Sequence, residues 1–492
     1  MRKTTSAFLF FFLMLFTICK SQRLDSRWAL GGPYSPPSFY GIDFDFSSGS
    51  LMISTVQRDM IFFETNGQIC DNNGNLLFFS NGIYIANAQN DTMLNGDGIN
   101  PGPFTTSNSN TALPLPQGNL VIPFPGDSTK YYLFHETSDD PHNTWATYYL
   151  YNSIIDMSLD AGLGAVIQKN NIVLQDTLVE GRLTACKHAN GRDWWLIVHK
   201  YNSGSVFKFL ITDQGISSPI LQDMVTIRDN CFGQNLFSPQ GNKFAYYDPC
   251  NDLDIWDFDR CTGEFSNLIH IDINDSSYSG GLAFSESGRY LYAVSTNYVY
   301  QFDLLATSID SSKITVGVYD GYLSGGLSAT FFLSALAPDG KIYSSCTNGT
   351  TVLHVINYPD SAGLACGFCQ HCIALPAYNN FTIPNHPNYS LQAEGGTICD
   401  SLPTSITKEN FIYTNDYNIF PNPSEHNIYL LVTGLNIETI SIYNSIGELI
   451  KLEFDLIKNE YLHFDISSLN TGFYYLELMT ADKKIVRRFI KN

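Results

Sequence analysis

The stretch FSPQGNKFAYY, at residues 237–247, is one of five in which a turn with a central glycine leads into an aromatic-rich strand. The other four are CDNNGNLLFFSNG at 70–82, KHANGRDWWLIVHK at 187–200, FSESGRYLYAV at 284–294 and LAPDGKIYSSC at 336–346. Glycine suits such a turn because it adopts positive φ without a side-chain clash, as tight hairpins require. The alternating or wholly apolar run that follows is typical of a strand buried between neighbours. The pattern predicts a recurring β-hairpin.

The turn glycines recur at a nearly constant interval. Gly191, Gly241, Gly288 and Gly340 are spaced 50, 47 and 52 residues apart, and a period near 50 has the size of one propeller blade. A strand pair at 119–123 and 131–135 and a last unit around 385–391 bring the count to about seven, within a range of six to eight. Radially arranged sheets bury their faces on each other and protect most edges. We therefore predict an all-β fold with a β-propeller over residues 22–400, whose opening strand at 39–46 completes the final blade.

Composition limits the possible partners. The chain has 492 residues, of which 44% are hydrophobic, 14% aromatic and only 15% charged, which favours an aromatic strand-rich core over disorder. Its 27 lysines and arginines against 47 aspartates and glutamates give a net charge of −20. Such a surface disfavours nucleic acid and anionic lipid as partners, because the dominant phosphate attraction would have the wrong sign.

The N-terminus has the pattern of a signal peptide. Arg2 and Lys3 precede an apolar run at 7–18, which is too short for a stable membrane span. The small side chain of Ser21 favours cleavage between Ser21 and Gln22. Lipid modification at Cys19 is the alternative, although Ile18 is larger than a lipoprotein signal prefers. Residues 1–21 are thus the predicted signal peptide, and no transmembrane segment is expected in the mature chain.

The last 76 residues, 417–492, form a separate pattern. Alternating apolar and polar runs at 427–432, 439–443, 449–454, 461–466, 473–478 and 485–490 predict six strands of a small immunoglobulin-like β-sandwich. The two prolines of IFPNP, at 419–423, fix a stiff start to this domain. The polar segment 401–416 is expected to be a linker that keeps the two domains independent.

Several landmarks of this region resemble the C-terminal sorting domain of Bacteroidetes type IX secretion substrates. They are IFPNP, ISIYNSIGELI at 440–450, DISSLNTGFYYLEL at 465–478 and the basic end KKIVRRFIK at 483–491. The resemblance implies a sorting signal that includes Pro421, Asn422, Pro423, Gly447, Gly472, Lys483, Lys484, Arg487 and Arg488. It also implies the type IX secretion machinery as a partner and a final location that is secreted or on the outer cell surface, reached through the periplasm. An ordinary immunoglobulin-like module is the alternative.

A second resemblance covers roughly residues 28–391. The stretches FYGIDFDFSSG at 39–49, CDNNGNLLFFSNG, LTACKHANGRDWW at 183–195 and WDFDRCTGEF at 256–265 resemble secreted Bacteroidetes propellers with tryptophan-aspartate-like repeats. Those proteins end in the same sorting domain. The resemblance implies a fold and a location, but no reaction.

The cysteines favour disulfide bonds. Ten of the 11 remain once Cys19 leaves with the signal peptide, and an even number in an exported protein points first to disulfides. Cys250 and Cys261 flank a strand-like stretch and are the expected local bridge. In CGFCQHC, at 366–372, zinc ligands would be too crowded to converge as a closed site requires. Disulfides involving Cys366, Cys369, Cys372 and also Cys399 or Cys346 are favoured there over metal.

Three polar clusters are candidates for chemistry, and each also has a structural interpretation. An acid-base or metal site is one interpretation of LFHETSDDPH, but its spacing is not that of a zinc protease helix, which favours a solvated loop. A catalytic pair of His188 and His199 around Asp193 would need the two rings side by side in space. A structural calcium ion could bind a carboxylate row on one strand, although an acidic edge strand is the simpler explanation. The first cluster, LFHETSDDPH at 133–142, contains His135, Glu136, Asp139, Asp140 and His142. The carboxylate row consists of Asp252, Asp254, Asp257 and Asp259.

Three functions remain compatible with these observations. The favoured one is a non-catalytic binding or adhesion platform that recognises an extracellular glycan or protein, with no cofactor. The second is an extracellular hydrolase or lyase, which would need acidic, histidine or tyrosine side chains converging at the propeller channel. The third is a structural component of the cell surface or of the gliding machinery.

Overall fold

The computed structural model describes residues 23–32, 41–139, 146–228, 231–400, 419–420, 422–431, 437–444, 447–452, 454–457, 461–480 and 484–492. The chain divides into two compact units, Met1–Ser401 and Leu402–Asn492. Among the described residues, no helix is long and apolar enough to cross a membrane.

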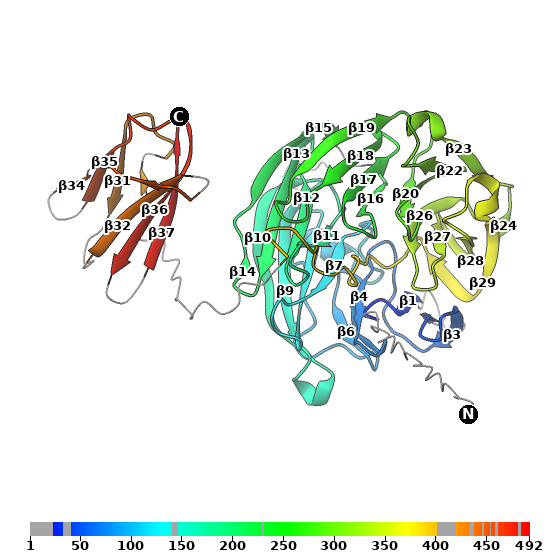
Figure 1. Cartoon of the computed structure of the whole chain (residues 1–492). Coiled ribbons are helices and arrows are strands. Elements are labelled where there is room, and N and C mark those ends of the chain that lie inside the picture. Colours follow the sequence, from blue (N-terminus) through cyan, green and yellow to red (C-terminus); the bar gives the residue numbers. More distant parts are fainter. Residues whose placement is uncertain are drawn as a thin grey trace, which may run out of the picture. The chain divides into compact units, whose positions relative to one another are not determined.

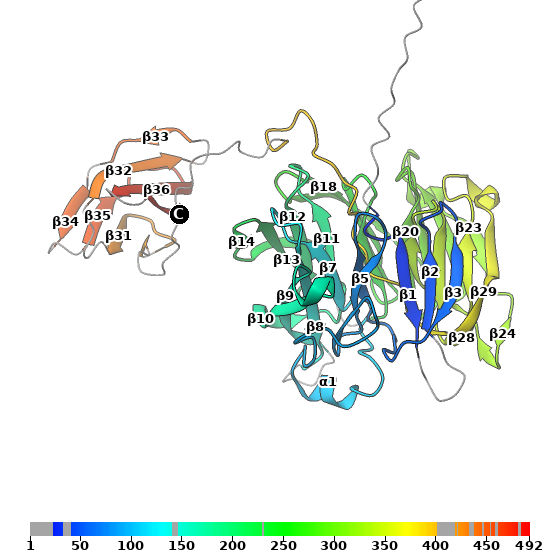
Figure 2. The same cartoon turned by 90° about the horizontal axis from the view of Figure 1, so that it is seen from below.

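The first unit is a β-propeller built from seven antiparallel sheets (Figures 1 and 2). The first strand of each sheet lies innermost, and the first strands of most neighbouring sheets contact one another around the axis. Blades 1 and 2 have three strands in the described residues, blades 3 and 5 to 7 have four, and blade 4 has five. Blade by blade, the strands are β1 (Arg27–Gly31), β2 (Gly41–Asp45) and β3 (Met52–Val56); β4 (Gly67–Cys70), β5 (Leu76–Ser80) and β6 (Ile85–Asn87); β7 (Asn119–Pro123), β8 (Lys130–Thr137), β9 (Thr147–Asp156) and β10 (Ala165–Leu178); β11 (Thr184–Lys187), β12 (Trp194–His199), β13 (Ser203–Thr212), β14 (Gly215–Ile216) and β15 (Ile220–Arg228); β16 (Gln234–Phe237), β17 (Lys243–Asp248), β18 (Asp252–Phe258) and β19 (Phe265–Ile271); β20 (Gly280–Phe284), β21 (Tyr290–Ser295), β22 (Tyr298–Asp303) and β23 (Ile314–Val318); and β26 (Phe331–Leu336), β27 (Ile342–Cys346), β28 (Gly349–Ile356) and β29 (Phe368–Asn380).

Short elements decorate the ring. A two-stranded hairpin of β24 (Leu323–Ser324) and β25 (Leu327–Ser328) lies between blades 6 and 7 in the sequence. The short helices are α1 (Pro103–Ser107) and the 3₁₀ turns η1 (Asp160–Gly162), η2 (Asp310–Ser312) and η3 (Gly363–Cys366).

The repeated glycine turn joins the first strand of a blade to its second. Gly191, Gly241, Gly288 and Gly340 all have positive φ, between 73° and 76°. This left-handed conformation is strained for residues with a side chain, so glycine is the natural residue at the turn. The same turn occurs at Gly74 in blade 2, with φ of 88°. The sequence repeat therefore marks one blade per unit.

The ring closes where blade 7 meets blade 1, and here two expectations were wrong. Strand β2 pairs with β1 and β3 in its own sheet, so it does not complete the final blade. All four strands of blade 7 come from residues 331–380. Closure instead comes from a shared apolar core that includes Trp28 and Phe44 of blade 1 and Phe332 and Leu353 of blade 7. The two end blades are joined by packing rather than by a shared sheet.

The second corrected expectation concerns residues 385–391, which form no blade. They belong to an irregular segment, residues 381–400, that follows β29 and that we call the strap. In Figure 1 the strap is the gold trace that crosses the middle of the ring, and in Figure 2 it emerges at the end opposite to α1. Pro384 and Pro387 lie in it, and proline cannot donate the ladder hydrogen bond of a central strand.

The second unit is a sandwich of two four-stranded antiparallel sheets. A single apolar core includes Ile428 and Phe464 of one sheet and Leu476 and Phe489 of the other. The expected strand at 449–454 is instead two short strands in opposite sheets, β33 (Leu449–Ile450) and β34 (Phe454–Ile457), because the chain changes sheets between them. The strands are β30 (Ile419–Phe420), β31 (Asn427–Leu431), β35 (Tyr461–Asp465) and β34 (Phe454–Ile457) in one sheet, and β33 (Leu449–Ile450), β32 (Ile437–Asn444), β36 (Gly472–Thr480) and β37 (Lys484–Lys491) in the other.

Candidate functional site

The candidate site is a cavity of about 570 Å³ at the propeller axis. It opens among the glycine turns, because Pro239, Glu286 and Gly340 of three successive turns line it. Blades 1, 3, 4, 5, 6 and 7 contribute to its wall, and residues 384–390 of the strap form one side. Its volume falls in the range of small-ligand pockets.

The strap occupies the part of the channel beside blades 2 to 4. The backbone N–H of Asn385 donates to the carbonyl of Asn66 at 2.9 Å. Its side-chain amide donates to the carbonyls of Asn119 at 3.0 Å and Leu183 at 2.8 Å. Tyr389 is buried, and its hydroxyl donates to the carbonyl of Val121 at 2.8 Å. The strap is therefore an integral wall of the cavity rather than a loose tail.

The far end of the strap is fixed to blades 4 and 5. The Arg260 guanidinium donates to the carbonyl of Gln392 at 2.7 Å, and the N–H of Glu394 donates to the carbonyl of Ala189 at 2.7 Å. A disulfide then joins Cys399 to Cys261. Because this bond closes a loop of 138 residues, it restricts the unfolded chain strongly and holds the strap in the channel.

Uncharged amides connect the blades around the cavity. Gln117 accepts from the N–H of Asn235 at 2.9 Å and donates to the carbonyl of Asn235 at 2.9 Å. Gln234 donates to the carbonyl of Ser334 at 2.8 Å and accepts from the N–H groups of Leu282 at 2.9 Å and Ser334 at 3.0 Å. These bonds link blades 3, 5, 6 and 7, so the cavity wall is rigid and rich in amide groups.

Two titratable side chains of the cavity have shifted pKa values. Burial raises the pKa of Asp25 to about 6 and lowers the pKa of His386 to about 4. The Nε2 atom of His386 is buried and has no hydrogen-bond partner in the described structure. A neutral imidazole and a carboxyl group that titrates near pH 6 thus share one cavity, which is a feature of acid-base sites. Both residues escaped sequence analysis, because each lies in an irregular segment without a motif. The two prolines of PNHPN, at 384–388, were the one signal that this segment is not a strand.

The cluster at the end of β8 is not a solvated loop in its described part, because His135 and Glu136 lie within the strand. His135 is fully buried and satisfied, with Nδ1 2.7 Å from Asn100 Oδ1 and Nε2 2.9 Å from Ser153 Oγ. Glu136 is also buried, and burial raises its pKa well above the usual range. Asp139 accepts from the N–H of Phe104 at the start of α1 at 2.8 Å. Asp140 and His142 lie outside the described residues.

His188 and His199 do not form a pair. His188 follows β11, and its Nε2 lies 3.1 Å from the carbonyl of Cys261. His199 ends β12 and packs against Phe244 and Tyr246. Asp193 lies at the turn, where it pairs with Arg192. The five-residue rise along β12 places the two histidines at opposite ends of the hairpin, on the order of 16 Å apart.

The four aspartates of blade 5 do not converge on one ion, and the expected acidic edge was wrong. Strand β18 pairs with β17 and β19, so it is not an edge. Asp254 is buried and pairs with Arg228 and His270, whereas Asp257 pairs with Lys243. Asp252 accepts from the N–H of Ile273 and Asp259 from that of Cys261, each at 2.8 Å. A different group, Asp252, His270 and Asp272, brings its ligand atoms within 4.8 Å of one another.

The cysteines pair differently from the expected local bridge. Cys250 is bonded to Cys231 and Cys261 to Cys399, so Cys250 and Cys261 are not joined to each other. The strand between them, β18, extends the chain and separates them. Cys369 is bonded to Cys372 within β29. Cys366 and Cys346 are free and buried, as are Cys70 and Cys186.

In the second unit, the landmark residue Asn422 bonds the segment after β30 to the last strand, β37. The side chain of Asn422 donates to the carbonyl of Arg488 at 3.1 Å and accepts from the N–H of Ile490 at 2.9 Å. Gly447 has φ of 81° in the turn between β32 and β33, and Gly472 begins β36. The Arg488 guanidinium lies 5.4 Å from the centre of the Phe473 ring. Arg487 and the backbone of Lys484 lie in β37.

Residues 418–492 match the family "Secretion system C-terminal sorting domain". The sorting domain thus coincides with the sandwich. It implies that the chain is a type IX secretion substrate that interacts with that machinery and is exported to the surface or beyond. Pro421, Lys483 and the cleavage position at Ser21 and Gln22 lie outside the described residues.

Solved structures similar to the first unit include several propellers. The β-propeller domain of Cps50 (Swd1) from Myceliophteria thermophila is 8% identical, with a TM-score of 0.38, over 65% of this chain and 90% of that one. The Dos1 propeller is 15% identical, with a TM-score of 0.38, over 64% and 79%. A protein of unknown function from Desulfotomaculum acetoxidans is 14% identical, with a TM-score of 0.36, over 70% and 96%. No curated protein matches the chain.

Proposed function

We propose that this chain is a secreted binding platform and that its ligand is a neutral, hydroxyl-rich molecule of the glycan class, held in the central cavity. The observation that carries the proposal is the rigid wall of amide and hydroxyl groups around a cavity of about 570 Å³. Gln117, Gln234 and Ser334 line the cavity without formal charge, and Trp28 and Phe237 add aromatic surface. Beyond their bonds across the blades, Gln117 Oε1 can accept one more hydrogen bond and Gln234 Nε2 can donate one more. Sites of this composition orient polar ligands through a few fixed hydrogen bonds.

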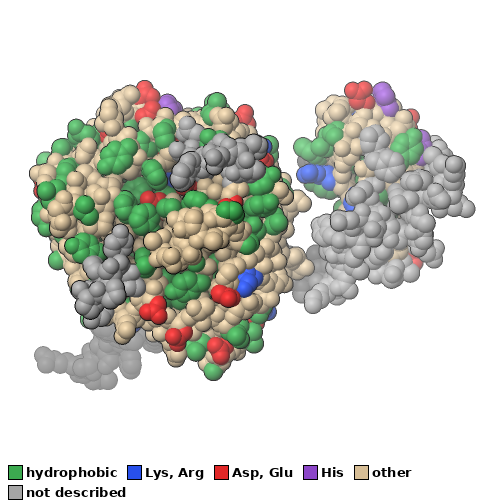
Figure 3. All heavy atoms as spheres, turned by 180° about the vertical axis from the view of Figure 1, so that it is seen from behind, with side chains coloured by type: hydrophobic (Ala, Val, Ile, Leu, Met, Phe, Trp, Pro, Cys, Tyr) green, Lys and Arg blue, Asp and Glu red, His purple; other side chains and the backbone are tan. Residues whose placement is uncertain are grey.

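The surface charge supports a neutral ligand. On the face shown in Figure 3, acidic and hydrophobic side chains are scattered among other polar groups, and few lysines or arginines are visible. With a net charge of −20, the chain repels polyanions in general. A neutral glycan avoids this repulsion.

A glycan array with the purified chain, followed by calorimetry with the best ligand, tests the proposal. Ala335 lines the cavity, so Ala335→Trp fills part of it and should weaken binding by at least about tenfold. Ala306 lies on a surface turn of blade 6 outside the cavity, and Ala306→Trp is the matched control that should bind normally. Equal binding by both variants would place the ligand elsewhere and reject the proposal.

Asp25 and His386 favour a second candidate, an extracellular hydrolase acting at the same cavity. The carboxyl group would act as the acid and the neutral imidazole as the base. Chromogenic glycosides test this candidate: turnover that falls at least about a hundredfold in Asp25→Asn, with ligand binding retained, would support it. Binding without turnover by the wild-type chain would leave only the binding platform.

We also infer that residues 417–492 direct export in a member of the Bacteroidetes, with residues 1–21 as the signal peptide and 401–416 as the linker. A truncation that ends at residue 416 should fold but remain in the periplasm. Fractionation of cells that express the full and the truncated chain measures this. Normal surface delivery of the truncated chain would contradict it.

A further inference from the structure

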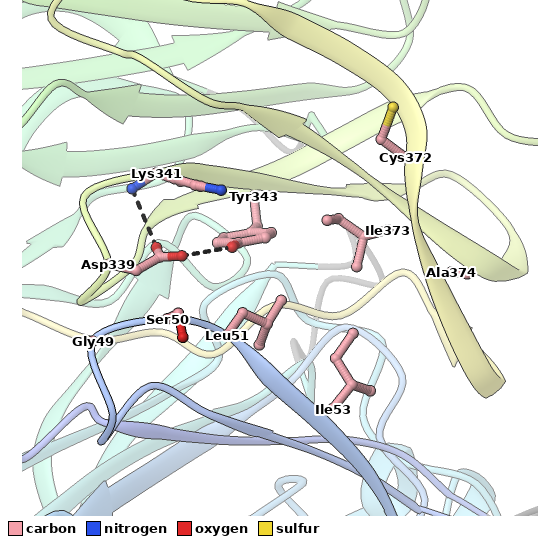
Figure 4. Close-up of a pocket in the computed structure, with 10 residues that line it drawn as sticks. All are labelled: Gly49, Ser50, Leu51, Ile53, Asp339, Lys341, Tyr343, Cys372, Ile373 and Ala374. Atoms are coloured by element: carbon pink, nitrogen blue, oxygen red, sulfur yellow. Dashed lines mark hydrogen bonds between the residues drawn. The ribbon is translucent and has the colours of Figure 1, made fainter.

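A second cavity lies at the seam where the ring closes. Blade 1 has only three described strands, so β3 is its outermost strand and leaves the space beside β29 of blade 7 partly open. The cavity there has a volume of about 390 Å³ (Figure 4). It differs from the axial cavity because no residue of the strap lines it, although Gly49 borders both cavities.

The walls of this seam cavity are partly apolar and partly polar. Leu51 and Ile53 of blade 1 face Ile373 of β29 and the ring of Tyr343 on β27 across the space (Figure 4). Two charged side chains, Asp339 and Lys341, stand at one end. The cavity is therefore amphipathic, with an apolar length and a charged end.

The two charges at that end are not equivalent. The Asp339 carboxylate is engaged, because it accepts from the Tyr343 hydroxyl at 2.8 Å and from the backbone N–H of Lys341 at 3.2 Å. The Lys341 ammonium group has no hydrogen-bond or ion-pair partner among the described residues. Every other described lysine of the propeller has a partner, as Lys130 has in Asp127 and Lys208 in Glu264. The remaining partners are Asp97 for Lys169, Trp194 for Lys187, Asp176 for Lys200, Asp257 for Lys243 and the carbonyl of Ile273 for Lys313.

We propose that the seam cavity binds a small anionic amphiphile, with its carboxylate on Lys341 and its apolar chain against Leu51, Ile53 and Ile373. A free ammonium group beside apolar walls complements a carboxylate joined to a hydrocarbon body. The carboxylate gains a charge-assisted bond, and the hydrocarbon body leaves water. In a chain with a net charge of −20, this local cation is the feature that admits an anion.

Decanoate is a suitable probe, with decanol and decyltrimethylammonium as neutral and cationic counterparts of equal chain length. Calorimetry on the full chain, below the micelle concentration of each probe, should show decanoate binding at one site. Decanol should bind at least about tenfold more weakly, because it loses the charge-assisted bond. No decanoate binding, or equal binding of the cationic probe, would overturn the proposal.

Variants locate the probe. Lys341→Gln should weaken decanoate at least about tenfold and leave decanol unchanged. Lys313→Gln is the control. It removes an ammonium group that lies 4.5 Å from the centre of the Tyr300 ring in blade 6, and it should change the affinity for neither probe. Ala374 is exposed at the cavity wall, so Ala374→Trp should block both probes, whereas Ala306→Trp should not. Unchanged decanoate binding by Lys341→Gln or by Ala374→Trp would reject the site. Glycan binding at the axis should persist in Lys341→Gln, so this test is independent of the proposed function.

Discussion

Blades 4 and 5 share an apolar core, as blades 7 and 1 do, but buried charges also cross between blades 4 and 5. The Arg228 guanidinium, at the end of β15, pairs with the fully buried carboxylates of Asp248 and Asp254, and its Nη1 atom lies 3.3 Å from Asp248 Oδ2. Its Cζ atom lies 4.0 Å from the centre of the Tyr246 ring. At the closing seam, Trp28 packs against Phe44 and Tyr343 with ring centres 6.2 and 5.9 Å apart.

The difference follows from the chain connection. A buried ion pair stabilises only when its geometry is good, and consecutive blades joined by a short connection hold that geometry. Blades 7 and 1 come from opposite ends of the domain and must meet without a shared strand. Hydrophobic burial is non-directional and tolerates small misalignments, which suits this seam. The cost is imperfect filling, which leaves the seam cavity.

Arg228→Ala should have the largest effect, because it removes the guanidinium that pairs with two buried carboxylates. We expect a loss of about 3 to 5 kcal/mol in the free energy of unfolding. Denaturant titration followed by tryptophan fluorescence measures it, and all five tryptophans lie in the propeller. Arg289→Ala, which removes an exposed partner of Asp303, is the control and should cost far less, because solvent screens this pair. Equal losses for the two variants would contradict this account of the seam.

Leu30→Ala should destabilise the closing seam by cavity formation. Leu30 is fully buried in the core shared by blades 1 and 7, and we expect a loss of about 3 kcal/mol. Leu305 is 76% exposed, so Leu305→Ala is the matched control with no measurable effect. The same fluorescence titration at low and high salt should give the same loss for Leu30→Ala, since no charge is involved. A strong salt dependence would mean that this seam is not held by apolar packing.

Replacing Cys261 and Cys399 together by serine should free the end of the strap. The bond closes a loop of 138 residues, and its removal should cost about 2 to 3 kcal/mol. The Cys369 and Cys372 pair is separated by only three positions, so the same double substitution there should cost clearly less. Melting temperatures of the two variants, measured side by side, decide the order. The reverse order would show that the strap does not depend on its disulfide.

Tyr343→Phe should weaken the closing seam only slightly. It removes the hydroxyl that donates to Asp339 and keeps the buried ring, so the expected loss is about 1 kcal/mol. Fluorescence-detected unfolding again measures it. A loss as large as that of Leu30→Ala would give the hydrogen bond, rather than the apolar packing, the main role at this seam.

The smallest effect concerns how stability depends on pH where blades 4 and 5 meet. The hydrogen bond from His270 to Asp254 raises the pKa of that histidine above its usual value. A raised pKa in the folded state stabilises the protein below the ordinary histidine pKa, and this contribution is lost as pH rises through the folded pKa. Wild type should therefore lose slightly more stability than His270→Gln between pH 6 and 8, by less than about 1 kcal/mol because the pair is partly exposed. Melting curves of both proteins at pH 6 and pH 8 measure this. An equal change in stability for wild type and His270→Gln would contradict the prediction.

Local patterns predicted much of the fold. The glycine turns located the hairpins of five blades, and the strand runs together with the PNP and basic-end landmarks identified the sandwich. The closure of the ring could not be predicted from local patterns. Whether β2 pairs within blade 1 or with blade 7 depends on contacts between residues about 300 positions apart. The disulfide of Cys261 was mispredicted for the same reason, since the strap brings Cys399 back from far along the chain.

By itself, the sequence determined the repeating unit, the all-β class and the sorting domain, because each depends on residues that are close together in the chain. It also determined the acidic net charge, which depends on composition alone. Only the tertiary structure decided how the ring closes, where the strap runs and which side chains share a cavity. Asp25 and His386 line one cavity, and Lys341 and Leu51 line another, only after seven sheets have packed around one axis. Packing brings together residues that are far apart in the chain. The neighbours of a residue without a local motif are therefore known only from the tertiary structure.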